Sequence, residues 1–237
     1  MRNNETSKLA NIKMLQFVAT QLGELCKEVV FLGGCTTALF ITDLAAPDVR
    51  YTLDVDCIVD VISLSQYYQL EQKLHKHKFK KSLNDDVICR WRYENAILDV
   101  MPTDEKILGF GNRWYKSAVQ YATLYPLSYD LKIQLVTAPH FFATKLEAFK
   151  DRGKMDFIAS SDFEDIISVL DGHSEIIAEI MDSEIELRKY LALSFKLIND
   201  SPSFHDALPG QFVYYGSLAD ERIKYLIQKI TAITQIQ

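Results

Sequence analysis

TLDVDCIVDV, residues 52–61, alternates apolar and polar side chains and therefore predicts a β-strand with one buried face. Asp54 and Asp56 share the other face, roughly 7 Å apart along the strand. Two carboxylates held this close repel each other unless a cation lies between them, and Mg²⁺ prefers such oxygen ligands. Acidic side chains are also common on the solvated face of a sheet, so this pattern alone leaves both interpretations open. The apolar face is formed by Leu53, Val55, Cys57, Val59 and Val61.

The preceding motif is VVFLGG, residues 29–34, which predicts a short buried strand that ends in a glycine turn. Gly33 and Gly34 allow backbone N–H groups to approach a phosphate closely. Thr36 and Thr37 follow at the start of a predicted helix, TTALFITDL, where an anion is favoured. The turn therefore indicates a phosphate-binding loop beside the acidic strand.

A third acidic residue lies further along the chain. The runs VICRWRY, residues 87–93, and AILDVMP, residues 96–102, flank a polar Glu94-Asn95 turn and predict a β-hairpin. Asp99 interrupts the second run, where an acid would be a poor choice for packing alone. A carboxylate from this neighbouring strand would complete a metal site with Asp54 and Asp56.

Composition describes a soluble globular protein. The chain has 237 residues, a net charge of −6 and 48% hydrophobic residues, which excludes disordered and collagen-like classes. No apolar run approaches the roughly 18 residues that a membrane helix requires, and the polar N-terminus lacks a signal-peptide core. We therefore expect a cytoplasmic protein with no membrane partner. The cysteines form no metal-binding pair and are expected to be buried thiols: Cys26, Cys35, Cys57 and Cys89.

The order of predicted elements indicates an α/β (α+β) fold with a mixed sheet followed by a mainly helical C-terminal region. We expect residues 1–135 to form the α/β domain, including an N-terminal helix, and residues 136–237 to form the helical domain. Apolar spacing predicts helices over residues 7–28, 64–77, 139–152, 161–171, 174–198 and 217–235.

Taken in order, Gly33-Gly34, Asp54-Val55-Asp56 and Asp99 resemble the signature of the polymerase-β-type nucleotidyltransferase superfamily. The lead-in RYTL, residues 50–53, resembles the branch that contains the AbiEii/AbiGii and MenT toxins. So do two later segments, PHFFATKLEAFKDRGKMDF (139–157) and SSDFEDIISVLDG (160–172). The resemblance covers roughly residues 29–172. One departure is Cys35, which stands where the superfamily usually carries Ser or Thr, so Thr36 is expected to supply the phosphate-binding hydroxyl.

The resemblance implies a magnesium-dependent nucleotidyltransferase, with manganese as an alternative metal, that moves a nucleoside monophosphate from a triphosphate to an acceptor hydroxyl. The metal ligands would be Asp54, Asp56 and Asp99, and Asp99 would also help to deprotonate the acceptor. Lys145 would be a further catalytic residue that neutralises the leaving pyrophosphate. The nucleotide-binding residues would be Gly33, Gly34, Thr36, Lys145 and Asp162. The acceptor implied by this branch is RNA, including tRNA, and an antitoxin protein would be a partner. Small-molecule and protein acceptors remain open. The alternative is a non-catalytic module that binds nucleotide or protein.

Several positions keep two interpretations. Lys145 lies at the edge of a predicted apolar helix stripe, where it would either bind phosphate or cover apolar surface with its stem. Asp162 lies in a first helical turn, where the helix dipole stabilises any acid, and Asp165 is expected to be solvated. Arg152 would meet phosphate or lie exposed at its helix end.

The run KLHKHKFKK, residues 73–81, is basic and would either grip an RNA backbone or form a solvated helix end, of which the second is favoured. Trp91, between Arg90 and Arg92, would either stack on a base or pack in the core.

Overall fold

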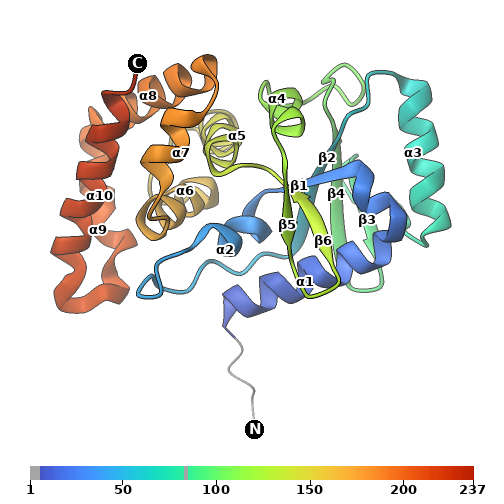
Figure 1. The fold of residues 1–237 in the computed structure, drawn as a ribbon, viewed down its shortest axis with the longest axis horizontal. Helices are drawn as coiled ribbons and strands as arrows, with labels where there is room; N and C mark the ends of the chain where they lie inside the picture. The colour runs from blue at the N-terminus through green and yellow to red at the C-terminus, as the bar shows by residue number, and fades with distance from the viewer. Residues whose placement is uncertain (1–5, 83–84) are drawn as a thin grey trace, which may run out of the picture. The chain divides into compact units, whose positions relative to one another are not determined.

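The fold of the chain is seen in a computed structural model that describes residues 6–82 and 85–237 (Figure 1). The chain divides into two compact units. The first comprises Met1–Ala38 and Arg50–Thr137, and the second comprises Leu39–Val49 and Ala138–Gln237. The first unit contains a mixed sheet with helices and the second is helical, so the α/β fold class expected from the sequence is confirmed.

A six-stranded sheet forms the centre of the first unit, in the order β3-β4-β2-β1-β6-β5. Two pairs, β2 with β4 and β1 with β6, are parallel, and the other neighbours are antiparallel. The predicted strands at residues 29–34 and 52–61 and the predicted hairpin are all present. The strands are β1 (Val29–Leu32), β2 (Asp54–Val59), β3 (Arg90–Tyr93), β4 (Ala96–Pro102), β5 (Thr123–Pro126) and β6 (Lys132–Leu135).

One face of this sheet is apolar and buried. Ring contacts join it to the two long helices of the unit, α1 (Ser7–Leu22) through Phe17 and Tyr93, and α3 (Leu64–Lys76) through His75 and Trp91. The expected apolar face of β2 is confirmed, except that Leu53 is 68% exposed because the strand begins only at Asp54. The shorter helices of this region are η1 (Gly23–Glu28), η2 (Gly34–Thr36), α2 (Thr37–Phe40) and α4 (Tyr115–Gln120).

A buried polar residue on α1 holds the segments that lead into both motifs. The Asn11 side chain is fully buried, donates to the Arg50 carbonyl at 2.9 Å and accepts from the Thr52 backbone N–H at 3.2 Å. The Asn11 carbonyl accepts a hydrogen bond from the Cys35 thiol at 3.3 Å. Because a buried amide left without partners is costly, these bonds fix the approach to β2 relative to the glycine turn.

The second unit is built from helices that enclose a cluster of phenylalanine rings, among them Phe149, Phe163 and Phe204. Its helices are α5 (Ala138–Asp151), α6 (Ser161–Gly172), α7 (Ile176–Asp182), α8 (Ile185–Asn199), α9 (Pro202–Gln211), η3 (Val213–Leu218) and α10 (Ala219–Thr234).

Some helix boundaries differ from the sequence-based expectation. The helix expected over 174–198 is two helices, because Ser183 takes an extended conformation between them. The helix expected after the glycine turn ends at Phe40, and the Thr42 and Asp43 N–H groups bond to the Gly172 carbonyl instead. The helix expected over 161–171 is present as α6, and its N-cap is Ser160, whose hydroxyl accepts from the Phe163 N–H.

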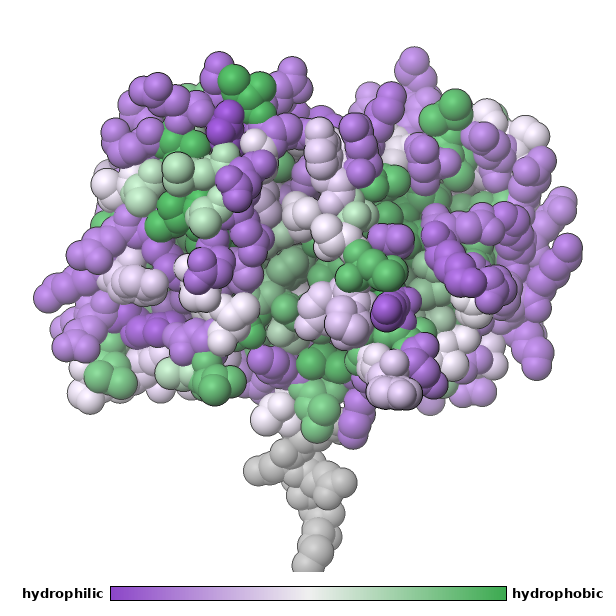
Figure 2. Space-filling view, in the orientation of Figure 1, coloured by the Kyte–Doolittle hydropathy of each residue, from purple (hydrophilic) through white to green (hydrophobic). Residues whose placement is uncertain are grey.

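Hydrophilic side chains cover much of the face in Figure 2, with hydrophobic ones among them. Within residues 6–82 and 85–237, every helix is too short or too polar to cross a bilayer.

Candidate active site

The three acids predicted as metal ligands lie on one face of two adjacent parallel strands. Asp56 of β2 is the register partner of Asp99 of β4, and Asp54 precedes Asp56 on the same face. The Asp99 residue is only 6% exposed, whereas Asp54 and Asp56 are half-buried. We refer to Asp54, Asp56 and Asp99 as the acidic row.

The glycine turn packs directly against the acidic row. Gly33 has a φ of +82°, a region that side-chain-bearing residues rarely adopt. A Cβ at this position would lie 2.0 Å from Oδ2 of Asp56, a distance that no two such atoms can share. The glycine is therefore required twice, once for the backbone conformation and once to leave room for the Asp56 carboxylate.

The hydroxyl expected to bind phosphate is already used within the turn. Thr36 is fully buried and its hydroxyl donates to the Gly33 carbonyl at 2.8 Å. Burial raises the pKa of the Cys35 thiol to about 12, so this residue is a neutral core side chain. The Thr37 hydroxyl is buried and has no hydrogen-bond partner among the described residues. Because the Thr36 hydroxyl already donates inside the turn, it is not available to donate to a phosphate as expected.

A guanidinium group that the sequence did not assign to the site pairs with two of the three acids of the acidic row. Arg90 of β3 is the register partner of Asp99. Its Nε donates to Asp99 Oδ1 at 2.9 Å and its Nη2 donates to Asp99 Oδ2 at 2.7 Å. The same Nη2 donates to Asp54 Oδ2 at 3.0 Å. The hydrogen bonds to Asp99 raise the pKa of Arg90, which is the direction expected for a cation held by anions.

The burial of Trp91 decides between its two expected roles, stacking on a base and packing in the core. Trp91 is fully buried, so it packs in the core and does not stack on a base. Arg92, two residues on, forms two hydrogen bonds with Asp85 at 2.8 and 2.6 Å. The signal that could have identified Arg90 is the turn itself, because a two-residue connection at Glu94-Asn95 places Arg90 opposite Asp99.

The donor chemistry of the acidic row suits a hard divalent cation, since it offers carboxylate oxygens from adjacent strands. Within residues 6–82 and 85–237, however, no three His, Cys, Asp or Glu side chains are grouped closely enough to hold a metal ion as they stand. Two of the acids instead hold the Arg90 guanidinium. The residues therefore fit a magnesium ion in charge and ligand type, provided that Arg90 gives up these carboxylates.

Lys145 and Asp162 lie in the second unit and form a buried ionic cluster there. Lys145 Nζ donates to Asp162 Oδ1 at 2.9 Å and to Asp165 Oδ2 at 2.7 Å. Burial by itself lowers the pKa of Lys145, but the charges of Asp165 and Asp162 outweigh burial and raise it. The expectation that Asp165 is solvated is wrong: the residue is 1% exposed and pairs with Lys145, because it faces α5 rather than water.

Arg152 completes the cluster from the protein surface. Its side chain is 71% exposed, and its guanidinium donates to both oxygens of Asp162 at 2.8 Å. The two cations and two acids of the cluster balance each other. These contacts favour a structural role for Lys145 and Asp162.

The basic run at residues 73–81 is partly engaged by acids and rings. Lys73 pairs with Glu28, and Lys81 pairs with Glu71 and lies over the Trp91 ring. Three further lysines of the run are exposed, namely Lys76, Lys78 and Lys80.

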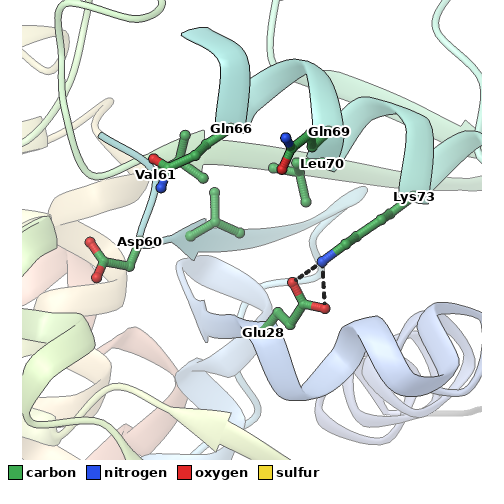
Figure 3. A pocket seen from close by; sticks show the side chains of 8 residues that line it. Glu28, Asp60, Val61, Gln66, Gln69, Leu70 and Lys73 are labelled. Carbon is green, nitrogen blue, oxygen red and sulfur yellow. Dashed lines mark hydrogen bonds and ion pairs between the residues drawn. The ribbon is translucent and has the colours of Figure 1, made fainter. Parts of the chain in front are cut away.

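A cavity of about 260 Å³ lies beside the far end of β2 from Asp54 (Figure 3). The Glu28–Lys73 ion pair borders it, and Gln66 and Gln69 of α3 line its wall. None of the residues of the acidic row lines this cavity, so its position does not coincide with the predicted site.

Among the comparisons with known proteins, only the one with solved structures gave a match. No protein-family model and no curated protein matches the chain. Among solved structures, the chain is similar to an antigenic nucleotidyltransferase-like protein from Paracoccidioides brasiliensis. The match has 17% identity, a TM-score of 0.48, and covers 90% of this chain and 92% of that one.

Replacing Gly33 with alanine should destabilise the first unit by about 3 kcal/mol, because the new Cβ collides with Asp56 and strains the backbone. Gly109→Ala is the matched control: φ at Gly109 is +79°, and no atom lies within 4 Å of the added Cβ. Strain alone should make that control cost about 1 kcal/mol. The free energy of unfolding of both variants is measured by urea unfolding followed by tryptophan fluorescence, since Trp91 and Trp114 lie in the first unit. Equal losses in the two variants would contradict the collision with Asp56.

The second unit should lose stability between about pH 4 and pH 2. Burial raises the pKa of Asp162, but the Arg152 hydrogen bond and the Lys145 charge outweigh it and lower the pKa to about 2. The unfolded value is about 3.9, so the contribution of Asp162 is present above pH 4 and is lost as the pH falls through its folded pKa.

Circular dichroism during urea unfolding at successive pH values measures this loss, which should reach about 2 kcal/mol. In Asp162→Asn the free energy of unfolding should change less between pH 4 and pH 2 than it does in wild type. Asp200→Asn, at an exposed position of the same unit, should keep the wild-type dependence. If the free energy of unfolding changes with pH equally in Asp162→Asn and in wild type, Asp162 is not the group responsible for the loss.

Proposed function

We propose that this protein is a divalent-metal-dependent nucleotidyltransferase that transfers a nucleoside monophosphate from a triphosphate to an acceptor hydroxyl. The observation that carries the proposal is the acidic row beside Gly33, in which Asp54, Asp56 and Asp99 share one sheet face. Three carboxylates on one half-buried sheet face repel one another, and the single positive charge of Arg90 offsets only part of their negative charge. Such a face is better explained by a cationic ligand.

In this proposal Asp54, Asp56 and Asp99 hold Mg²⁺ or Mn²⁺. The bound metal would supply charge neutralisation for the phosphates and lower the pKa of the acceptor hydroxyl. Asp99 would accept the proton of that hydroxyl. Backbone N–H groups of Gly33 and Gly34 would orient the phosphates, a role that the packing of the glycine turn against the acidic row supports.

The finer parts of the proposal rest on the sequence resemblance. We assign RNA, including tRNA, as the acceptor, and a growth-inhibiting toxin role with a separate antitoxin protein. The part of Lys145 in binding the leaving pyrophosphate would require the lysine to leave Asp162 and Asp165. The proposal is therefore carried by the acidic row and does not depend on Lys145.

A non-catalytic binding module is the second candidate function. The observation that favours it is the pairing of Asp54 and Asp99 with Arg90, together with the use of the Thr36 hydroxyl inside the turn. Such a module would bind a nucleoside triphosphate without releasing pyrophosphate. A measurement of transfer and of pyrophosphate release therefore separates the two functions.

Asp56→Asn should lower nucleotide transfer at least about a hundredfold, because it removes a metal ligand without changing the shape of the side chain. The measurement uses Mg²⁺, each α-³²P-labelled triphosphate and total cellular RNA, resolved on a denaturing gel. Asp60→Asn is the matched control, since Asp60 is an exposed acid just beyond the end of β2. Equal transfer by Asp56→Asn and wild type would overturn the proposed chemistry, and triphosphate binding without transfer would favour the module.

Expression of the wild-type chain alone should slow bacterial growth, because uncontrolled transfer to tRNA would disable translation. The Asp56→Asn chain, expressed to the same level, should leave growth unchanged. Growth curves with matched immunoblots measure this difference. Equal slowing by both chains would remove the enzymatic explanation for toxicity.

A further inference from the structure

Arg90 reaches across a neighbouring strand to the acidic row. It extends from β3, the edge strand of the sheet, over β4, and its Nη2 contacts Asp54 on β2. The side chain is 20% exposed, and it makes two hydrogen bonds to Asp99 and one to Asp54. Arg90 thus binds the Asp99 carboxylate in a bidentate manner, which is a strong arrangement for arginine and fixes the position of the guanidinium.

The guanidinium therefore contacts the same oxygens that a divalent metal would need. Metal ions bind carboxylates through the oxygen lone pairs, and three of the four oxygens of Asp54 and Asp99 already accept hydrogen bonds from Arg90. Arg92, on the same strand and face, is held by Asp85 instead. Arg90 therefore pairs with acids of the acidic row, whereas Arg92 pairs with an acid outside it.

We infer that Arg90 is a built-in competitor of the metal: it stabilises the metal-free acidic row, and metal binding requires it to release Asp54 and Asp99. This inference rests on the proposed function, because it concerns the metal site of that function. It goes further in predicting that the affinity for metal is set by an arginine and not only by the ligands. Once released, the guanidinium is an unpaired cation on the acidic face, where an anionic triphosphate would be its natural partner.

The test measures Mn²⁺ binding to the full chain without nucleotide, by the electron paramagnetic resonance signal of free Mn²⁺ during titration. Arg90→Gln should bind Mn²⁺ at least about tenfold more tightly than wild type, the factor expected when charge-assisted hydrogen bonds no longer have to be broken. Arg90→Lys keeps the charge but loses the two-pronged geometry, so its affinity should be intermediate. Arg92→Gln, the matched control, should bind as wild type does.

Asp99→Asn in the Arg90→Gln background should abolish the added affinity, which locates the ion at the acidic row. If Arg90→Gln does not fold, Arg90→Lys carries the test, since it retains a cation beside the acids. Equal or weaker Mn²⁺ binding in the Arg90 variants, or no binding by any of the proteins, would overturn the inference. The result is independent of the transfer measurement: active transfer with unchanged Mn²⁺ affinity in Arg90→Gln would overturn only the competition.

Discussion

Repulsion among the carboxylates of Asp54, Asp56 and Asp99 is the constraint on which the first unit depends. The register of β2 with β4 places Asp56 beside Asp99, and the buried opposite face of β2 prevents the strand from turning its acids elsewhere. A one-residue slip would bury the acids and expose Val55 and Cys57. The fold therefore accepts the repulsion and offsets it with a cation, which in this structure is Arg90.

The surroundings of the acidic row are arranged around this constraint. Gly33 leaves the space that the Asp56 carboxylate fills, and Asn11 anchors the backbone that leads into β2. Because Cys35 bonds to the carbonyl of the same Asn11, the glycine turn and the acidic strand are held by one residue of α1. This network explains how a site of polar groups can be kept in a fixed arrangement at the edge of an apolar core.

The second unit contains its own ionic cluster, in which, unlike in the acidic row, the positive and negative charges are balanced. Lys145, Asp162 and Asp165 are buried and Arg152 covers them from outside, so the charges are balanced and desolvated together. Removing one partner of such a cluster leaves an uncompensated buried charge, which is strongly destabilising. Pattern alone could not separate this role from phosphate binding, since a lysine at the edge of an apolar helix stripe suits both.

The sequence by itself determined the strands at residues 29–34 and 52–61, the hairpin around Glu94-Asn95 and the face that carries Asp54 and Asp56, because strand periodicity is a local property. The register of the hairpin is equally local and could have placed Arg90 opposite Asp99, but the sequence analysis did not assign Arg90 to the site. Only the tertiary structure decided that β2 pairs with β4 in parallel, that Arg90 also reaches Asp54, and that Asp165 is buried against Lys145. These contacts join residues 20 to 43 positions apart, and their partners are chosen by packing and charge in three dimensions, which no local pattern specifies.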